Sequence, residues 1–175
     1  MARVLGVEVL QLTMFPTRSG EMASAPSRSA AWLSGSASVH EQQRANEIDA
    51  IISLAGPHAE CKFRGKVPSK PKWDYDLANA QAAIARAALL SVNPIEAPQL
   101  LDVLGPNERG RALTPSESAE AKRLWKHLDS TTRNLIEENW PAIERVANAA
   151  LRLRILTEGE IDTLIKTPQA FSAVT

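Results

Sequence analysis

The stretch "TPSESAEAKRLWKHLDSTTRNLIEE", residues 114–138, predicts the fold class of this protein. Thr114 can cap a helix, a proline follows at the first helical position, and Glu117 can complete a capping box. Apolar or small side chains then recur at helical spacing, at Ala121, Leu124, Trp125, Leu128, Thr132, Leu135 and Ile136. We therefore expect a long amphipathic helix here, with Trp125 on the stripe that faces the core.

Helical patterns also lie on both sides of this stretch. Upstream, "RANEIDAIISLAGPHAECKF" (44–63) places Ile48, Ile51, Ile52, Ala55 and Ala59 on one face of a helix that begins near His40. Gly56-Pro57 falls inside it, and a proline costs a helix interior about 3 kcal/mol, so we expect a kink or a break there. Residues 74–90 predict a second, alanine-rich helix.

The remaining segments add a small β element and shorter helices. "VEVLQLTMF" (7–15) is rich in β-branched and apolar residues and predicts a strand, followed by a long loop over 16–38. A short helix is expected near 99–104. Pro141 either kinks the long helix or starts another, which runs to Leu156, and a second capping box at 157–160 opens a short last helix. The predicted fold class is mainly α, with one strand or a small sheet near the N-terminus.

Composition excludes several classes of protein. The 175 residues include 20 basic and 20 acidic side chains, so a dominant nucleic-acid or anionic-membrane surface is not expected, although a neutral total can hide a local patch. Cys61 is the single cysteine, which excludes an internal disulfide framework, suits the cytoplasm and is typical of a small buried hydrophobe. No apolar run approaches the roughly 18–20 residues that span a bilayer, and the N-terminus does not resemble a signal peptide.

Histidine patterns do not build a metal site by themselves. His40-Glu41-Gln42-Gln43-Arg44 nearly matches the zinc-protease pattern His-Glu-x-x-His, but Arg44 stands where the second imidazole would be and cannot donate a lone pair to a metal. We interpret this segment as a polar helix start. His58 is interpreted as part of an ordinary helix, and His127 as a surface or boundary residue without a second ligand nearby.

Asp74 and Asp76 begin the alanine-rich helix. Acids in a first helical turn satisfy free N–H groups and complement the helix dipole, for roughly 0.3–1 kcal/mol each. A carboxylate can also bind zinc, yet one carboxylate does not make a site. From the residues alone, capping is the favoured role for both.

Two segments in order resemble a known family. "IDAIISLAGPHAECKFRG" (48–65) followed by "DLANAQAAIAR" (76–86) is similar to the peptidase domain of FtsH-type, AAA-linked zinc metalloendopeptidases. The matching positions are Ala55, Gly56, Ala59, Glu60, Phe63 and Gly65 in the first motif and Asp76, Leu77, Ala80, Ile84, Ala85 and Arg86 in the second. Pro57 and His58 depart from the family pattern.

The resemblance extends to the ends of the chain. Residues 3–16 look like the strand that follows the family's zinc helix, and residues 151–165 look like its closing helix and short terminal helix. It implies an FtsH-type peptidase-like domain over 1–165, N-terminally incomplete, with a tail at 166–175. The chain is most similar to stand-alone relatives that carry no ATPase module.

The resemblance separates the two acids. It implies that Asp76 is the third zinc ligand of the complete domain, whereas Asp74 keeps a capping role. The two histidines and the catalytic glutamate of the family come from a His-Glu-x-x-His helix that these 175 residues lack. "ARVLG" (2–6) is typical of the last turn of such a helix, so a late start at an internal methionine is favoured over a real truncation.

The implied function is therefore a zinc metalloendopeptidase-like domain that is inactive without the missing helix, and that by itself binds zinc weakly or not at all. The alternative is a non-catalytic helical interaction or regulatory protein. Whether the protein is an enzyme stays open at this point. The implied partners are a polypeptide substrate for the completed domain, contacted by the loop over 16–38, and a separate ATPase or a second copy of the chain. No nucleic-acid partner is expected.

Overall fold

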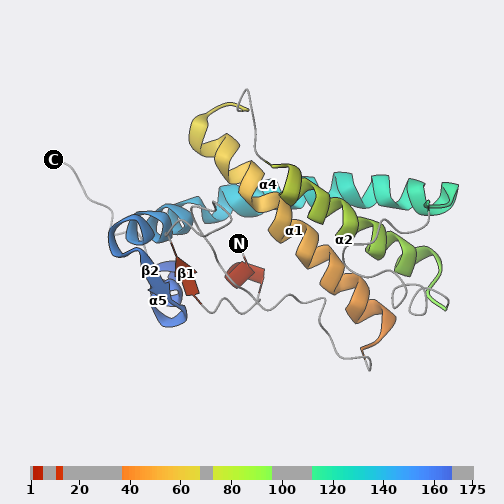
Figure 1. Ribbon diagram of the computed structural model, residues 1–175, viewed down its shortest axis with the longest axis horizontal. Coiled ribbons are helices and arrows are strands. Elements are labelled where there is room, and N and C mark those ends of the chain that lie inside the picture. The colour runs from red at the N-terminus through yellow and green to blue at the C-terminus, as the bar shows by residue number, and fades with distance from the viewer. Residues whose placement is uncertain (1, 6–10, 14–36, 68–72, 96–111, 167–175) are drawn as a thin grey trace. The chain divides into compact units, whose positions relative to one another are not determined.

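The computed structural model describes residues 2–5, 11–13, 37–67, 73–95 and 112–166. The described part is mainly helical, which confirms the predicted fold class (Figure 1). Its elements are η1 (Ala2–Leu5), β1 (Gln11–Thr13), α1 (Val39–Arg64), α2 (Asp74–Val92), α4 (Pro115–Leu153), β2 (Ile155–Thr157) and α5 (Glu158–Lys166). The chain forms two compact units: unit 1 comprises Met1–Arg28 and Leu135–Thr175, and unit 2 comprises Ser29–Asn134.

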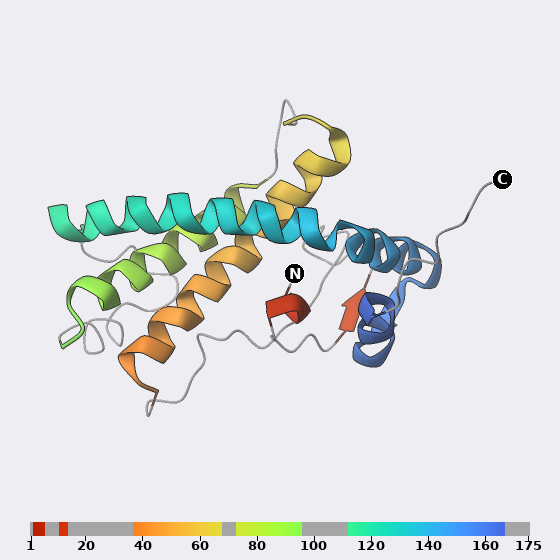
Figure 2. The ribbon, with the colours of Figure 1, turned by 180° about the vertical axis from the view of Figure 1, so that it is seen from behind.

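Unit 2 is built on the pairing of α1 with α2, which lie side by side in both ribbon views (Figures 1 and 2). Small side chains make the close approach possible, because Ala50 on α1 and Ala80 and Ala87 on α2 are completely buried. The predicted face of α1 is confirmed at Ile51 and Ala55. Its deepest positions are instead those next to the predicted stripe, such as Leu54.

The start of α4 forms as the sequence predicts. The Glu117 backbone N–H donates to Thr114 Oγ1 at 3.3 Å, and the Glu117 carboxylate accepts from the Thr114 N–H at 2.8 Å. Glu117 is fully buried and also accepts from the Asn93 side chain at the end of α2 at 2.7 Å. Leu124, Leu128 and Thr132 of the expected stripe are buried, whereas Trp125 is only half-buried.

Of the expected kink or break at Pro57, and of the expected kink or new helix at Pro141, the break and the new helix do not occur. α1 continues without interruption through Pro57, and α4 continues through Pro141. A proline removes one hydrogen bond and adds a local clash. In α1 this local cost is offset by the burial of Pro57 itself and of Leu54 and Ala55 in the turn before it.

Unit 1 contains a two-stranded antiparallel sheet of β1 and β2, in which Leu12 pairs with Leu156. Residues 11–13 confirm the predicted first strand where the structure describes it. The second strand was missed, because residues 155–156 were expected to continue a helix. Leu156 is fully buried in a cluster with Ala149, Ala150 and Ile161.

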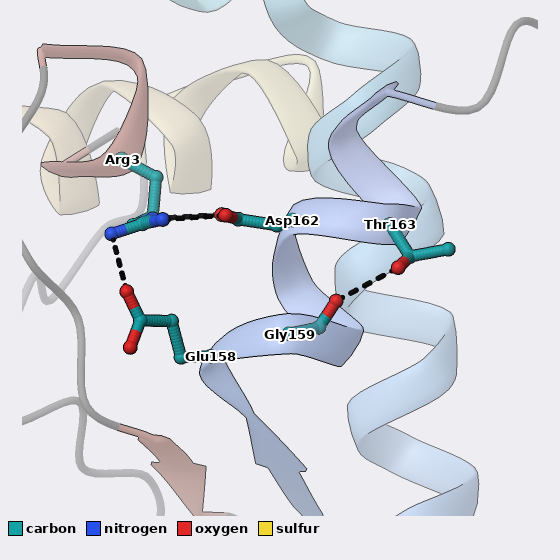
Figure 3. Close-up of polar contacts among 5 residues, drawn as sticks. All are labelled: Arg3, Glu158, Gly159, Asp162 and Thr163. Atoms are coloured by element: carbon teal, nitrogen blue, oxygen red, sulfur yellow. Dashed lines mark hydrogen bonds and ion pairs between the residues drawn. The ribbon is translucent and has the colours of Figure 1, made fainter.

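Helix α5 closes unit 1 and is tied to the N-terminal segment. Figure 3 shows Arg3 reaching from η1 to two acids of α5. Its guanidinium donates to both Asp162 oxygens at 2.8 and 2.6 Å and lies 2.9 Å from Glu158 Oε1. The predicted capping residues are also in contact, since Glu160 accepts from the Thr157 N–H and hydroxyl, each at 2.8 Å.

Some predictions lie outside the described residues. These are most of the strand over 7–15, the loop over 16–38 up to residue 36, the short helix near 99–104 and all but the first residue of the tail at 166–175. Among the helices of the described part, none is long and apolar enough to cross a membrane.

Candidate functional site

Asp76 lies at the contact between the two helices that carry the family-like motifs. It is the third residue of α2 and is half-buried. A Cβ placed on Gly56 of α1 would lie 3.7 Å from Asp76 Oδ2, so the carboxylate faces the backbone of α1 at this point. Gly56 and Asp76 belong to different motifs of the sequence, and the structure brings them together.

The charge of Asp76 is costly in this position. Burial raises the pKa of its carboxyl above the ordinary aspartate value, because removing water disfavours the charged form. No residue of the described part donates a hydrogen bond to it. An unpaired, partly buried carboxylate is unfavourable for stability, and such groups occur more often at functional sites than elsewhere.

Asp74 has different surroundings. It is exposed in the first turn of α2, where its charge complements the helix dipole. The capping position itself is occupied by Trp73, whose side chain makes no capping hydrogen bond. The capping role predicted for Asp74 is therefore wrong by one position. Trp73 occupies the cap, and Asp74 is the first helical residue, where it contributes only its charge.

Glu60 and Trp73 connect the end of α1 to the start of α2. Trp73 Nε1 donates to Glu60 Oε2 at 2.6 Å, and Arg64 Nε donates to Glu60 Oε1 at 2.7 Å. The indole hydrogen bond, and secondarily the arginine, hold the pKa of Glu60 below its ordinary value. The resemblance identified Glu60 as a motif residue without giving it a role, and the structure gives it this structural one.

Arg86, the last residue of the second motif, is also bound between the helices. Its Nε donates to Asn46 Oδ1 of α1 at 2.9 Å, and Asn46 is buried. Desolvation lowers the pKa of Arg86, although the nearby Asp49 opposes this effect. This contact fixes the register of α2 against α1, at a distance from Asp76.

The structure contains a histidine–aspartate pair that was not predicted from the sequence. His58 Nε2 lies 2.8 Å from Asp129 Oδ1 of α4, and Arg133 Nη2 lies 3.0 Å from the other oxygen of Asp129. Because 71 residues separate His58 from Asp129, no local pattern predicted the pair. It lies within unit 2 and links α1 to α4.

The described residues do not fit a zinc site. In the part of the chain that the structure describes, no group of three His, Cys, Asp or Glu side chains is arranged to hold a metal ion. His127 is exposed, as predicted, and Cys61 is free and only half-buried. Asp76 therefore has no described partner ligand.

The near-match to the zinc-protease pattern forms a helix cap. The Glu41 carboxylate accepts from the Ser38 N–H and hydroxyl at 2.7 Å each, and the Glu41 N–H donates to Ser38 Oγ at 3.3 Å. This confirms the interpretation of residues 40–44 as a polar helix start. The hydrogen bonds from Ser38 hold the pKa of Glu41 below its ordinary value.

Comparison with known proteins gives no family by itself. The chain matches no protein-family model, and it matches no curated protein.

Proposed function

We propose that this chain is a peptidase-like domain of the FtsH type, in which Asp76 is the carboxylate ligand of the metal in the completed domain. The proposal holds that these 175 residues do not cleave peptide bonds by themselves. Zinc would be a cofactor of the completed domain only, where a polypeptide would be the substrate.

One observation carries the proposal, namely that the Asp76 carboxylate lies close to the backbone of α1 at Gly56. The two motifs that resemble the family lie on α1 and α2, and this proximity brings the first motif next to the proposed ligand. Nothing in the described part pairs with the Asp76 carboxylate. The burial that raises its pKa is therefore not compensated by a hydrogen bond or an ion pair. A purely structural acid at this position would be better placed in solvent, as Asp74 is.

The test compares zinc binding in two proteins. The 175-residue chain should hold no tightly bound zinc at one ion per chain, because one carboxylate cannot replace three protein ligands. A chain extended at its N-terminus by a His-Glu-x-x-His helix, taken from the upstream reading frame if it encodes one, should gain zinc and peptidase activity. Asp76→Asn should abolish both gains, whereas Asp74→Asn should leave them intact.

The proposal fails if Asp76→Asn leaves zinc binding of the extended chain unchanged. It also fails if the 175-residue chain itself purifies with one tightly held zinc. Metal content by elemental analysis and cleavage of an unfolded protein substrate give the two readouts.

A second candidate is a non-catalytic helical interaction or regulatory protein. Large apolar side chains that stand exposed on the described part favour it, because such residues often mark sites of association. An extended chain that binds no zinc and cleaves no substrate, with or without Asp76, would favour this candidate over the first.

A further inference from the structure

We draw no further inference here: the strongest candidate, the surface patch formed by the exposed apolar side chains of Phe63, Val67 and Tyr75 where α1 ends and α2 begins, carries no proposal because nothing in the structure shows what covers it.

Discussion

At the scale of single residues, the two aspartates in the first turn of α2 differ in their exposure to solvent. Asp74 is exposed, whereas Asp76 faces α1 beside Gly56 and its pKa is raised by burial. A carboxyl with a raised pKa in the folded state binds its proton more readily there than in the unfolded chain. The protein is therefore destabilised by Asp76 above that pKa, and the penalty disappears as the pH falls through the raised value toward the ordinary one.

This difference predicts the effect of removing each charge. Both substitutions lose the favourable dipole interaction of an acid in the first turn, but only Asp76→Asn also removes a partly buried charge. At neutral pH we expect Asp76→Asn to be about 0.5–1 kcal/mol more stable than Asp74→Asn, a modest gap because Asp76 keeps some exposure. Urea denaturation at several pH values measures it.

The gap should close in acid, where Asp76 is protonated in the folded protein. A gap that stays constant from neutral to acidic pH would show that burial of the carboxylate is not its cause. Equal stability of the two variants at neutral pH would also contradict the prediction, and it would weaken the case that Asp76 is held at a cost.

At the scale of elements, α1 and α4 end in the same backbone conformation with different residues. Gly65 after α1 has a φ of 66°, and Arg154 after α4 has a φ of 68°. Glycine adopts this region freely, whereas other residues pay roughly 1–2 kcal/mol for it. Arg154 is tolerated because the chain must leave α4 at once to form β2, which buries Leu156.

Arg154→Gly should therefore stabilise the protein. We expect a gain of about 0.5–1 kcal/mol, which is reduced from the full strain because glycine also frees the unfolded chain. Arg152→Gly is the matched control, since position 152 is helical and glycine there should cost roughly 0.5–1 kcal/mol. Thermal and urea unfolding of both variants test this, and a loss of stability in Arg154→Gly would show that the arginine side chain outweighs the strain.

At the scale of the whole molecule, residues from the two ends of the chain meet in unit 1. Arg3 holds two acids of α5, and β1 pairs with β2, so distant segments complete one cluster. The hydrogen bonds from Arg3 lower the pKa of Asp162. A lowered carboxyl pKa stabilises the folded state above the ordinary value, and this contribution is lost as the pH falls through the lowered one.

Arg3→Gln should increase local unfolding of α5 and of no other helix. We expect faster amide hydrogen exchange over Glu158–Lys166 at neutral pH, with exchange in α1 and α2 unchanged, because their contacts do not involve Arg3. The difference from the unchanged protein should shrink in acid, once Asp162 is protonated. Arg123→Gln is the control, since Arg123 pairs with Glu120 inside α4 and its loss should leave α5 unaffected. Uniform exchange changes along the chain would contradict the prediction.

The sequence by itself determined the features that depend on near neighbours. Periodicity and capping boxes predicted the mainly α class, the start of α4 at Thr114 and Glu117, and the polar start of α1, because these signals act within one or two helical turns. It also predicted that His127 lies on the surface. The domain limits and the role of Asp76 remain predictions from the family resemblance.

Only the tertiary structure decided the features that depend on residues far apart. β2 exists because β1 supplies its hydrogen-bond partners across the chain, the paired helices tolerate Pro57, and His58 meets Asp129. The different environments of Asp74 and Asp76 likewise come from the packing of α2 on α1. In each case the free energy depends on burial and pairing between distant segments, and a local pattern carries no information about those.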